Sequence, residues 1–266
     1  MKRFVLLPLV ALLLAATPAH LQAQDFKSKF SSRQNRKVVL DMQGSDVTVE
    51  GYDGDELLIQ SSGGYEAPPA RAEGLRAVYN SAQDNTRLGL NVSAESDNTL
   101  RIIRASRSEG RYTVKVPRQT AVIYNQTSWM GGSSDLLLRD VAGRIEVNLK
   151  SGDMKLLNVS GPVVAHTISG DILVKFQSAP TEPSAISTVS GDVDVTLPAS
   201  TKASFSMRSV SGEIYTDFDL SLPKTRDDDD NLRHVGGSTV EGRANGGGTS
   251  FALKTVSGDI FVRKAK

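Results

Sequence analysis

The sequence predicts an all-β protein whose strands wind into the stacked coils of a β-solenoid, or β-helix-like repeat domain. Three observations support this class: apolar and polar residues alternate along most of the chain, a short Ser-Gly-Asp phrase recurs, and helical spacing is nearly absent. Twenty-three glycines and an aromatic content of only 6% agree with a fold that is rich in tight turns. The alternative architecture is an antiparallel β-sandwich, in which turns also recur every 8–12 residues.

The alternation predicts strands that bury one face and expose the other. It is clear at Val47 and Val49, along residues 112–116 and along residues 145–149. Residues 69–79 have some helical character, but Gly74 interrupts them, so we expect a loop or a single turn there. Residues 224–237, which include the acidic run Asp227–Asp230, predict a solvated loop.

The recurring phrase is the strongest pattern in the chain. A full copy consists of Ser, Gly, an acidic residue and then Ile, Val or Met, and in most copies Val or Ile precedes the Ser. The phrase predicts a turn followed by a buried strand. Degenerate copies are centred on Gly143 and Gly161. The full copies, which predict the repeat turns, are centred on Gly152, Gly170, Gly191, Gly212 and Gly258.

The spacing of these glycines predicts the length of a coil. The first four, from Gly143 to Gly170, are nine residues apart, which is one strand plus a bend, so two units make a coil of 18 residues. The next two steps are 21 residues each. We therefore expect one column of glycines in the chain order Gly152, Gly170, Gly191 and Gly212, with Gly258 on a last coil enlarged by a loop.

The same arrangement predicts the core. Aliphatic residues two and four positions after each glycine point inward and stack from coil to coil. Ile172, Val193 and Ile214 should then be neighbours in one dry column.

The domain organisation follows from composition along the chain. Residues 1–23 predict a secretory signal peptide, because Lys2 and Arg3 precede a thirteen-residue apolar run and a candidate cleavage site at 21–23. The run is shorter than the roughly 20 residues of a membrane span, although an uncleaved anchor is the alternative. Residues 24–266 form one elongated domain, with regular repeats at 143–264 and a less regular β part at 36–142. No later segment predicts a transmembrane helix, so we expect an exported protein, periplasmic or at the cell surface.

The acidic residue of each phrase allows two interpretations. In the first, Ser and Asp cap the turn by hydrogen bonding to backbone N–H groups, and no ligand is needed. In the second, Asp171, Asp192 and Glu213 stand in one column and hold a divalent cation such as calcium. Each copy supplies one acid and one glycine, too few oxygen ligands for a well-formed site, so we prefer turn capping and expect no metal or cofactor.

Composition excludes several classes of function. The absence of cysteine rules out disulfides, thiolate metal sites and a cysteine nucleophile, and a net charge of +1 gives no basis for nucleic-acid binding. After residue 23 the only histidines are His166 and His234, and no catalytic motif occurs in a suitable context. We therefore expect a protein that is not an enzyme. The alternative is a glycan-active solenoid lyase or hydrolase, which needs two carboxyl groups in a cleft; Trp129 and Tyr124 are its candidate sugar-stacking residues.

These phrases resemble the bacterial putative-adhesin family, a domain of unknown function with SGD(I/V) β-repeats. The resemblance rests on the VSGDI-type copies, on SDVTVEGYDGDELLI from Ser45, on YTVKVP from Tyr112 and on GGGTSFALKTVSGDIFVRK from Gly246. It covers most of residues 38–264 and implies a β-helix-like fold in the bacterial envelope or outside the cell. It brings no catalytic residues.

The sequence as a whole predicts a non-enzymatic, adhesin-like envelope or surface module. Its expected partner is an envelope polymer or protein, bound along one face of the solenoid. A purely structural or assembly role in the envelope is a further alternative. Self-association through the terminal coils is compatible with both.

Overall fold

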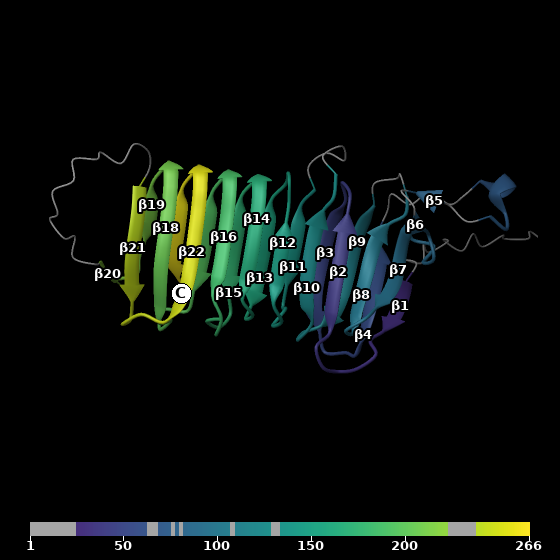
Figure 1. Ribbon diagram of the computed structural model, residues 1–266, viewed down its shortest axis with the longest axis horizontal. Helices are drawn as coiled ribbons and strands as arrows, with labels where there is room; N and C mark the ends of the chain where they lie inside the picture. Colours follow the sequence, from purple (N-terminus) through teal and green to yellow (C-terminus); the bar gives the residue numbers. More distant parts are fainter. Residues whose placement is uncertain are drawn as a thin grey trace, which may run out of the picture.

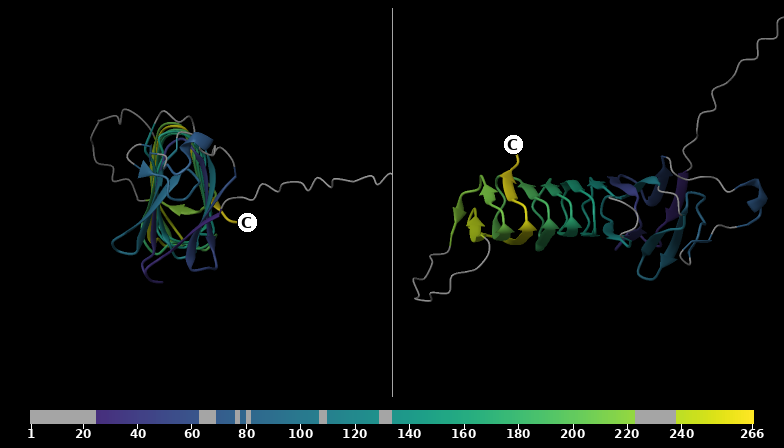
Figure 2. Two further views of the ribbon diagram at one scale, coloured as in Figure 1. Left: turned by 90° about the vertical axis from the view of Figure 1, so that its right-hand side faces the viewer. Right: turned by 90° about the horizontal axis from the view of Figure 1, so that it is seen from above.

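The computed structural model describes residues 25–62, 69–75, 78–79, 82–106, 110–128, 134–222 and 238–266. These residues form an elongated, flattened tube with two long walls (Figure 1 and Figure 2). Successive strands along most of the chain alternate between the walls, and neighbours within a wall are mostly parallel. The predicted all-β solenoid is therefore confirmed, and the antiparallel sandwich is wrong. The predicted signal peptide, Trp129, Asp227–Asp230 and His234 lie outside the described residues.

Sheet A forms one wall. Within the described residues its ten strands are, in spatial order, β1 (Asp25–Lys29), β4 (Glu56–Ser61), β9 (Arg111–Pro117), β3 (Asp46–Tyr52), β11 (Leu136–Arg139), β13 (Met154–Val159), β15 (Ile172–Phe176), β17 (Val193–Leu197), β23 (Ile260–Lys264) and β19 (Ile214–Thr216).

Sheet B forms the opposite wall. Its eleven described strands are, in spatial order, β20 (Leu220–Ser221), β21 (Ser238–Ala244), β18 (Ala203–Ser211), β22 (Thr249–Ser257), β16 (Ser184–Ser190), β14 (Val163–Ser169), β12 (Ile145–Asn148), β10 (Ala121–Gln126), β2 (Lys37–Met42), β8 (Thr99–Arg104) and β7 (Leu90–Glu95). A separate short pair consists of β5 (Val78–Tyr79) and β6 (Ala82–Gln83). The expected single turn is a 3₁₀ turn at Ala70–Ala72.

One coil is a strand of sheet B followed by a strand of sheet A. The regular coils run through β10/β11, β12/β13, β14/β15 and β16/β17. In sheet A, Leu136 pairs with Met154, Met154 with Ile172, and Ile172 with Val193. These registers advance by 18, 18 and 21 residues, which confirms the coil lengths that the glycine spacing predicts.

The order of the last coils differs from the predicted chain order. Val193 pairs with Ile260, and Ile260 pairs with Ile214, so the C-terminal coil β22/β23 lies between β16/β17 and β18/β19. Figure 1 shows the yellow β22 between β16 and β18. Ile172 and Val193 are neighbours as expected, but Val193 and Ile214 are not. The phrases in β18 and β22 are nearly identical, so spacing alone could not tell which of them stacks on β16.

The N-terminal end has the same arrangement. The first coil, β2/β3, lies between β10/β11 and the later coil β8/β9. Antiparallel strands then cover the ends: β4 and β1 continue from β9, β7 pairs with β8, and β21 and β20 continue from β18. Among the described strands, antiparallel pairing thus covers both outer edges of the parallel coils in sheet B and the β9 edge in sheet A, whereas β19 is the outer strand at the other end of sheet A.

Charged pairs fix the bend between β3 and β4 at this end. Arg36, only 9% exposed, donates a 2.9 Å hydrogen bond to Asp55, which also pairs with Arg33 at 2.7 Å. The hydrogen bond from Arg36 lowers the pKa of Asp55, although burial opposes the shift. A carboxyl group with a lowered pKa stabilises the fold above its unfolded pKa, and this contribution is lost as the pH falls through the folded pKa.

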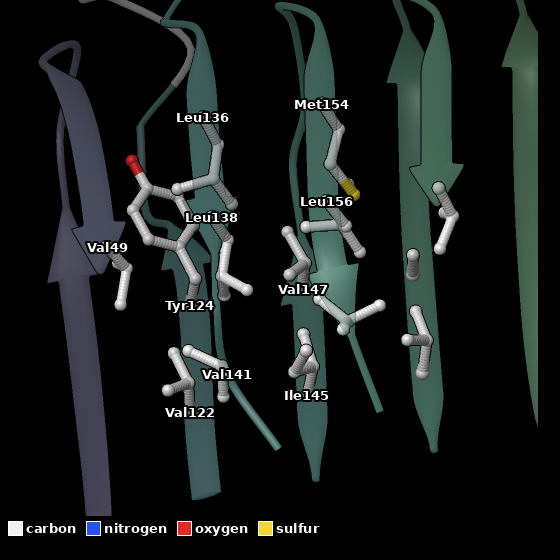
Figure 3. Packing of buried hydrophobic residues seen from close by; sticks show 14 of the residues in the cluster. Val49, Val122, Tyr124, Leu136, Leu138, Val141, Ile145, Val147, Met154 and Leu156 are labelled. Atoms are coloured by element: carbon white, nitrogen blue, oxygen red, sulfur yellow. The ribbon is translucent and has the colours of Figure 1, made fainter. Parts of the chain in front are cut away.

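The core is the aliphatic layer between the two sheets. Figure 3 shows Val122, Ile145 and Val147 of sheet B packed against Leu138 and Leu156 of sheet A. Inward positions two and four after the turn glycines are buried in the coils of β15, β17 and β23. In the coil of β19, Ile214 is only partly buried and Thr216 is exposed, because β19 is the last strand of its sheet.

Replacement of Gly191 by valine tests the corner geometry. Gly191 has φ +137°, and a Cβ there would lie 2.2 Å from the carbonyl oxygen of Gly170. We expect a loss of about 3 kcal/mol in the free energy of unfolding, seen as a fall of roughly 6–12 °C in Tm.

The matched control is Ser190→Val at the preceding, exposed position of the same strand. It should change stability by less than about 0.5 kcal/mol. Equal melting temperatures of the two variants would contradict the corner assignment.

Candidate ligand-binding edge

The repeated glycines lie along one long edge, where the chain passes from sheet B to sheet A. A Cβ on Gly170 would lie 2.1 Å from the carbonyl oxygen of Gly152, and the same close approach recurs at Gly258 against Gly191 and at Gly212 against Gly258. Gly152, Gly170, Gly191 and Gly258 also have positive φ, whereas for Gly212 the close approach alone requires glycine. All five predicted turn glycines thus occupy one column, in the spatial order 152, 170, 191, 258, 212.

The acidic residues form a continuous ladder beside this column, which we call the carboxylate row. Asp192 donates its backbone N–H to Oδ1 of Asp171 at 2.8 Å, Asp259 donates to Asp192 at 2.8 Å, and Glu213 donates to Asp259 at 2.9 Å. The structure therefore brings Asp171 and Asp192 together but separates Glu213 from them by Asp259. The complete row is Asp46, Asp135, Asp153, Asp171, Asp192, Asp259 and Glu213.

Two members of the row were missed in the sequence. Asp46 and Asp135 continue the ladder, and Ser45 and Ser134 stand at the corner before them. The available signal was the Ser-Asp pair followed by alternating aliphatic residues, which occurs at residues 45–49 and 134–138. The missing glycine hid these copies.

A column of buried hydroxyl groups was also missed. Thr188 donates its hydroxyl to the carbonyl oxygen of Gly170 at 3.2 Å, Thr255 donates to Gly191 at 3.0 Å, and Ser209 donates to Gly258 at 2.9 Å. Each hydroxyl lies three residues before the glycine of its own coil and bonds to the glycine of the neighbouring coil. The signal in the sequence is a Thr or Ser at that position in TISGD, TVSGD and SVSGE.

This geometry supports turn capping for the acids. In every carboxylate of the row except Glu213, one oxygen accepts a backbone N–H of the next coil. Calcium takes six to eight oxygen ligands, far more than two adjacent rungs can offer. Among the described residues no group of three or more His, Asp or Glu side chains is placed to hold a metal ion.

A shallow groove follows the carboxylate row on the outer face of sheet A. One hollow of about 250 Å³ extends from Asp46 to Lys155, and a second of about 370 Å³ extends from Asp153 to Phe261. Because both are lined by Asp153 and Lys155, they form one groove. Its floor consists of residues paired across successive coils: Thr48, Leu137, Lys155, Leu173, Asp194 and Phe261. The same line of paired residues, which we call the floor row, continues past the groove to Tyr215.

An aromatic stack lies at the C-terminal end of the floor row. The rings of Tyr215 and Phe261 are parallel within 11°, with centroids 5.3 Å apart, and Tyr215 is 50% exposed. The guanidinium of Arg263 lies over the Phe261 ring, 5.0 Å from its centroid, and bonds to Asp194. The half-exposed Tyr215 therefore stands beside Phe261, the aromatic residue that lines this end of the groove.

On the sheet B side of the same edge, aliphatic side chains face outward. Val189 is 40% exposed, Val256 46% and Val210 40%, and they stand two residues before their turn glycines on three neighbouring strands. A solvated strand face ordinarily carries polar residues at such positions, so the edge as a whole is amphipathic.

The candidate residues of the enzyme alternative do not meet in this groove. His166 lies on the outer face of sheet B, where its Nδ1 contacts the Ser187 hydroxyl at 3.0 Å. Tyr124 is fully buried in the core, so it is not available to stack on a sugar as the enzyme alternative would require. Burial raises the pKa of the Tyr124 hydroxyl, as expected for a phenol removed from water.

The fold and edge together define a two-sheet β-solenoid module with a repeated acidic edge. The chain belongs to the Toastrack DUF4097 family, whose model matches residues 19–263. The resemblance to the putative-adhesin domains of unknown function is thereby confirmed. No curated protein matches the chain.

Three solved structures are similar to this chain at low identity. A "putative cell adhesion protein" from Clostridium sporogenes shares 9% identity with a TM-score of 0.47, covering 92% of this chain and 100% of that one. A "putative adhesin" from Bacteroides fragilis shares 12% identity (TM-score 0.35, 91% and 97% covered). A "putative lipid binding protein" from Parabacteroides distasonis shares 11% identity (TM-score 0.30, 92% and 97% covered).

In the part of the chain that the structure describes, no helix has the length and apolar character of a membrane span.

Replacement of Thr255 by valine tests the hydroxyl column. Valine has nearly the same shape, but it leaves the Gly191 carbonyl without its 3.0 Å partner in a buried site. We expect a loss of about 1 kcal/mol, or roughly 2–4 °C in Tm. Thr239→Val on the exposed face of β21 is the control, and an equal effect of both variants would refute the role of the hydroxyl.

Calcium addition tests the two interpretations of the carboxylate row. Because these carboxylates already accept backbone N–H groups, we expect the Tm of the purified protein to be the same with roughly millimolar calcium as with a chelator. A rise of many degrees that a chelator reverses, and that Asp171→Asn with Asp192→Asn abolishes, would establish the cation ladder instead.

Proposed function

We propose that this protein is a non-enzymatic module of the bacterial envelope or cell surface that binds an extended polymer lengthwise along the carboxylate row. The observation that carries the proposal is the groove beside that row, which spans six coils from Asp46 to Phe261. A row of similar side chains at the roughly 4.8 Å spacing of neighbouring strands suits a ligand that is itself repetitive.

The charge of the groove favours a polymer with positive groups. Its lining includes Asp135, Asp153, Asp171 and Asp192 but only one ammonium group, Lys155. Two further lining acids, Asp46 and Asp194, already pair with Arg111 and Arg263. Like charges held this close favour a partner that supplies opposite charge. Tyr215, half exposed beside the groove's end, offers an apolar ring face and a hydroxyl of the kind that contacts sugar rings. We therefore favour a glycan that carries free amino groups.

The arrangement of the acids argues against glycoside cleavage. Hydrolysis requires one protonated and one ionised carboxyl group at set separations on either side of the scissile bond. Here the acids follow one another in a line along a shallow groove. Nearly all of them accept the same kind of hydrogen bond, from a backbone N–H group of the next coil. Binding along the row needs no such asymmetry.

Export is part of the proposal. It is supported by the signal-peptide pattern at residues 1–23. Mass spectrometry of the protein from the cell envelope should find an N-terminus near Gln24, and a retained Met1 would refute cleavage.

The binding test uses the mature protein and calorimetric titration with a chitosan oligosaccharide, which carries free amines. The chitin oligosaccharide of equal length, with acetylated amines, and polylysine are the comparison ligands. We expect chitosan to bind and chitin to bind more weakly, and we expect added salt to weaken the chitosan complex.

The decisive variant is the triple change Asp153→Asn, Asp171→Asn and Asp192→Asn. Each amide oxygen can still accept the backbone N–H of the next coil, so the fold is preserved while three charges are removed. At about 0.5 kcal/mol for each exposed charge contact, the loss of three contacts should raise the Kd about tenfold. The control, Glu146→Gln with Glu241→Gln on sheet B, should bind normally. Equal binding by triple variant and control would overturn the groove assignment, and polylysine binding without chitosan binding would overturn the glycan assignment.

A further inference from the structure

The C-terminal coil occupies a space that the rest of the chain leaves open. β16/β17 and β18/β19 are connected in sequence, yet they are separated by the thickness of one coil, and β22/β23 fills that space. We call the space between β16/β17 and β18/β19 the slot. Phe251, Leu253, Ile260 and Val262 of the inserted coil are almost fully buried. Without an occupant, the slot and its two walls would expose apolar surface.

The contacts that hold the coil in the slot are those of the general repeat. Thr255 bonds to Gly191 and Ser209 bonds to Gly258 through the hydroxyl column, while Asp259 takes its place in the carboxylate row. Every one of these contacts is made by the TVSGD phrase at residues 255–259. Side-chain contacts particular to this coil add to them. The ring of Phe251 lies 5.7 Å from that of Phe176 and 5.5 Å from that of Phe205, Phe261 stacks on Tyr215, and Arg263 bonds to Asp194. The slot therefore recognises residues 249–264 by their own sequence, whichever molecule supplies them.

The connection to this coil is built like a hinge. β21 ends at Ala244 and β22 begins at Thr249, and the segment between them contains three consecutive glycines. Gly246 and Gly247 have φ near +85°, and Gly248 passes so close to Lys202 that a Cβ would lie 2.3 Å from its carbonyl oxygen. Asn245 bonds to the carbonyl oxygens of Ala199 and Thr201. The chain thus crosses the start of β18 from one side to the other, and the coil that follows can be withdrawn without disturbing any other strand connection.

We propose that the slot also accepts the C-terminal coil of a second copy of this chain, so that two molecules exchange residues 249–264. Exchange preserves every contact of the coil and changes only the path of residues 245–248, which is why domain swapping at a glycine-rich connection is a low-cost route to dimers. Reciprocal exchange gives a closed dimer, and exchange with successive molecules gives a linear assembly. This proposal is independent of what the carboxylate row binds.

Cysteine cross-linking tests the exchange, because the chain contains no native cysteine. Ser187 in β16 and Lys254 in β22 are direct partners across the slot boundary, and Lys254 is exposed. Neighbouring strands are about 4.8 Å apart, within the Cα–Cα range of a disulfide. Ser187→Cys with one affinity tag and Lys254→Cys with another are co-produced in one cell, purified through both tags and oxidised.

We expect a disulfide-linked species of twice the monomer mass that contains both tags and the 187–254 linkage by mass spectrometry. Its share should increase with the level of expression, because exchange is bimolecular. The control pairs Ser187→Cys with Lys175→Cys, an exposed position in β15 that no exchange brings near β16 of another molecule. The double variant Ser187→Cys/Lys254→Cys in one chain shows whether the linkage can form. The proposal would be overturned by the following combination of results. The disulfide forms within the chain of the double variant, but the co-produced single variants give no more disulfide-linked dimer than the control pair.

Discussion

The whole architecture depends on how closely one coil approaches the next at the Ser-Gly-Asp edge. Neighbouring parallel strands lie about 4.8 Å apart, and at the corner this places the Cα of each glycine against the carbonyl of the preceding one. A side chain at Gly170, Gly191 or Gly258 would overlap backbone atoms that cannot move without separating the sheets. With the glycines in place, the hydroxyl column donates hydrogen bonds to the glycine carbonyl oxygens. The carboxylate row accepts hydrogen bonds from the backbone N–H groups of the acidic residues in the next coil. The residues of one repeat phrase thus supply all of these contacts for one corner.

The same constraint produces the surface on which the proposed function rests. A ladder that caps turns must carry an acid at the same position in every coil, so a row of charges along the edge follows from the fold itself. One oxygen of each aspartate accepts a backbone N–H of the next coil. Replacing aspartate by asparagine keeps an oxygen that can accept this hydrogen bond but removes the negative charge. Structure and binding can therefore be tested independently along one row.

Much of the coil was readable in the sequence, and the reasons for the rest are specific. Spacing predicted the coil length and the inward positions, since Ile172 and Val193 pair as expected. It could not predict that Ile260 lies between Val193 and Ile214, because SVSGE and TVSGD make the same corner and only three-dimensional packing decides their order. Asp46 and Asp135 were missed because serine replaces glycine at their corners. The groove was not predictable either, since it depends on which outward side chains stand side by side across coils.

Both chain ends follow one plan: the first and last coils are each covered by a coil from the chain's interior. A coil so placed is paired on both sides, which restrains it from fraying, and among the described strands antiparallel pairs cover every outer edge except that of β19. The order of coils is therefore the central claim, and intramolecular disulfides at high dilution test it most directly. The account predicts that Ser187→Cys/Lys254→Cys closes within one chain and that Ser187→Cys/Arg208→Cys does not, because Lys254 lies between Ser187 and Arg208. Closure of the 187–208 pair instead would show that the coils stack in chain order and would contradict the account.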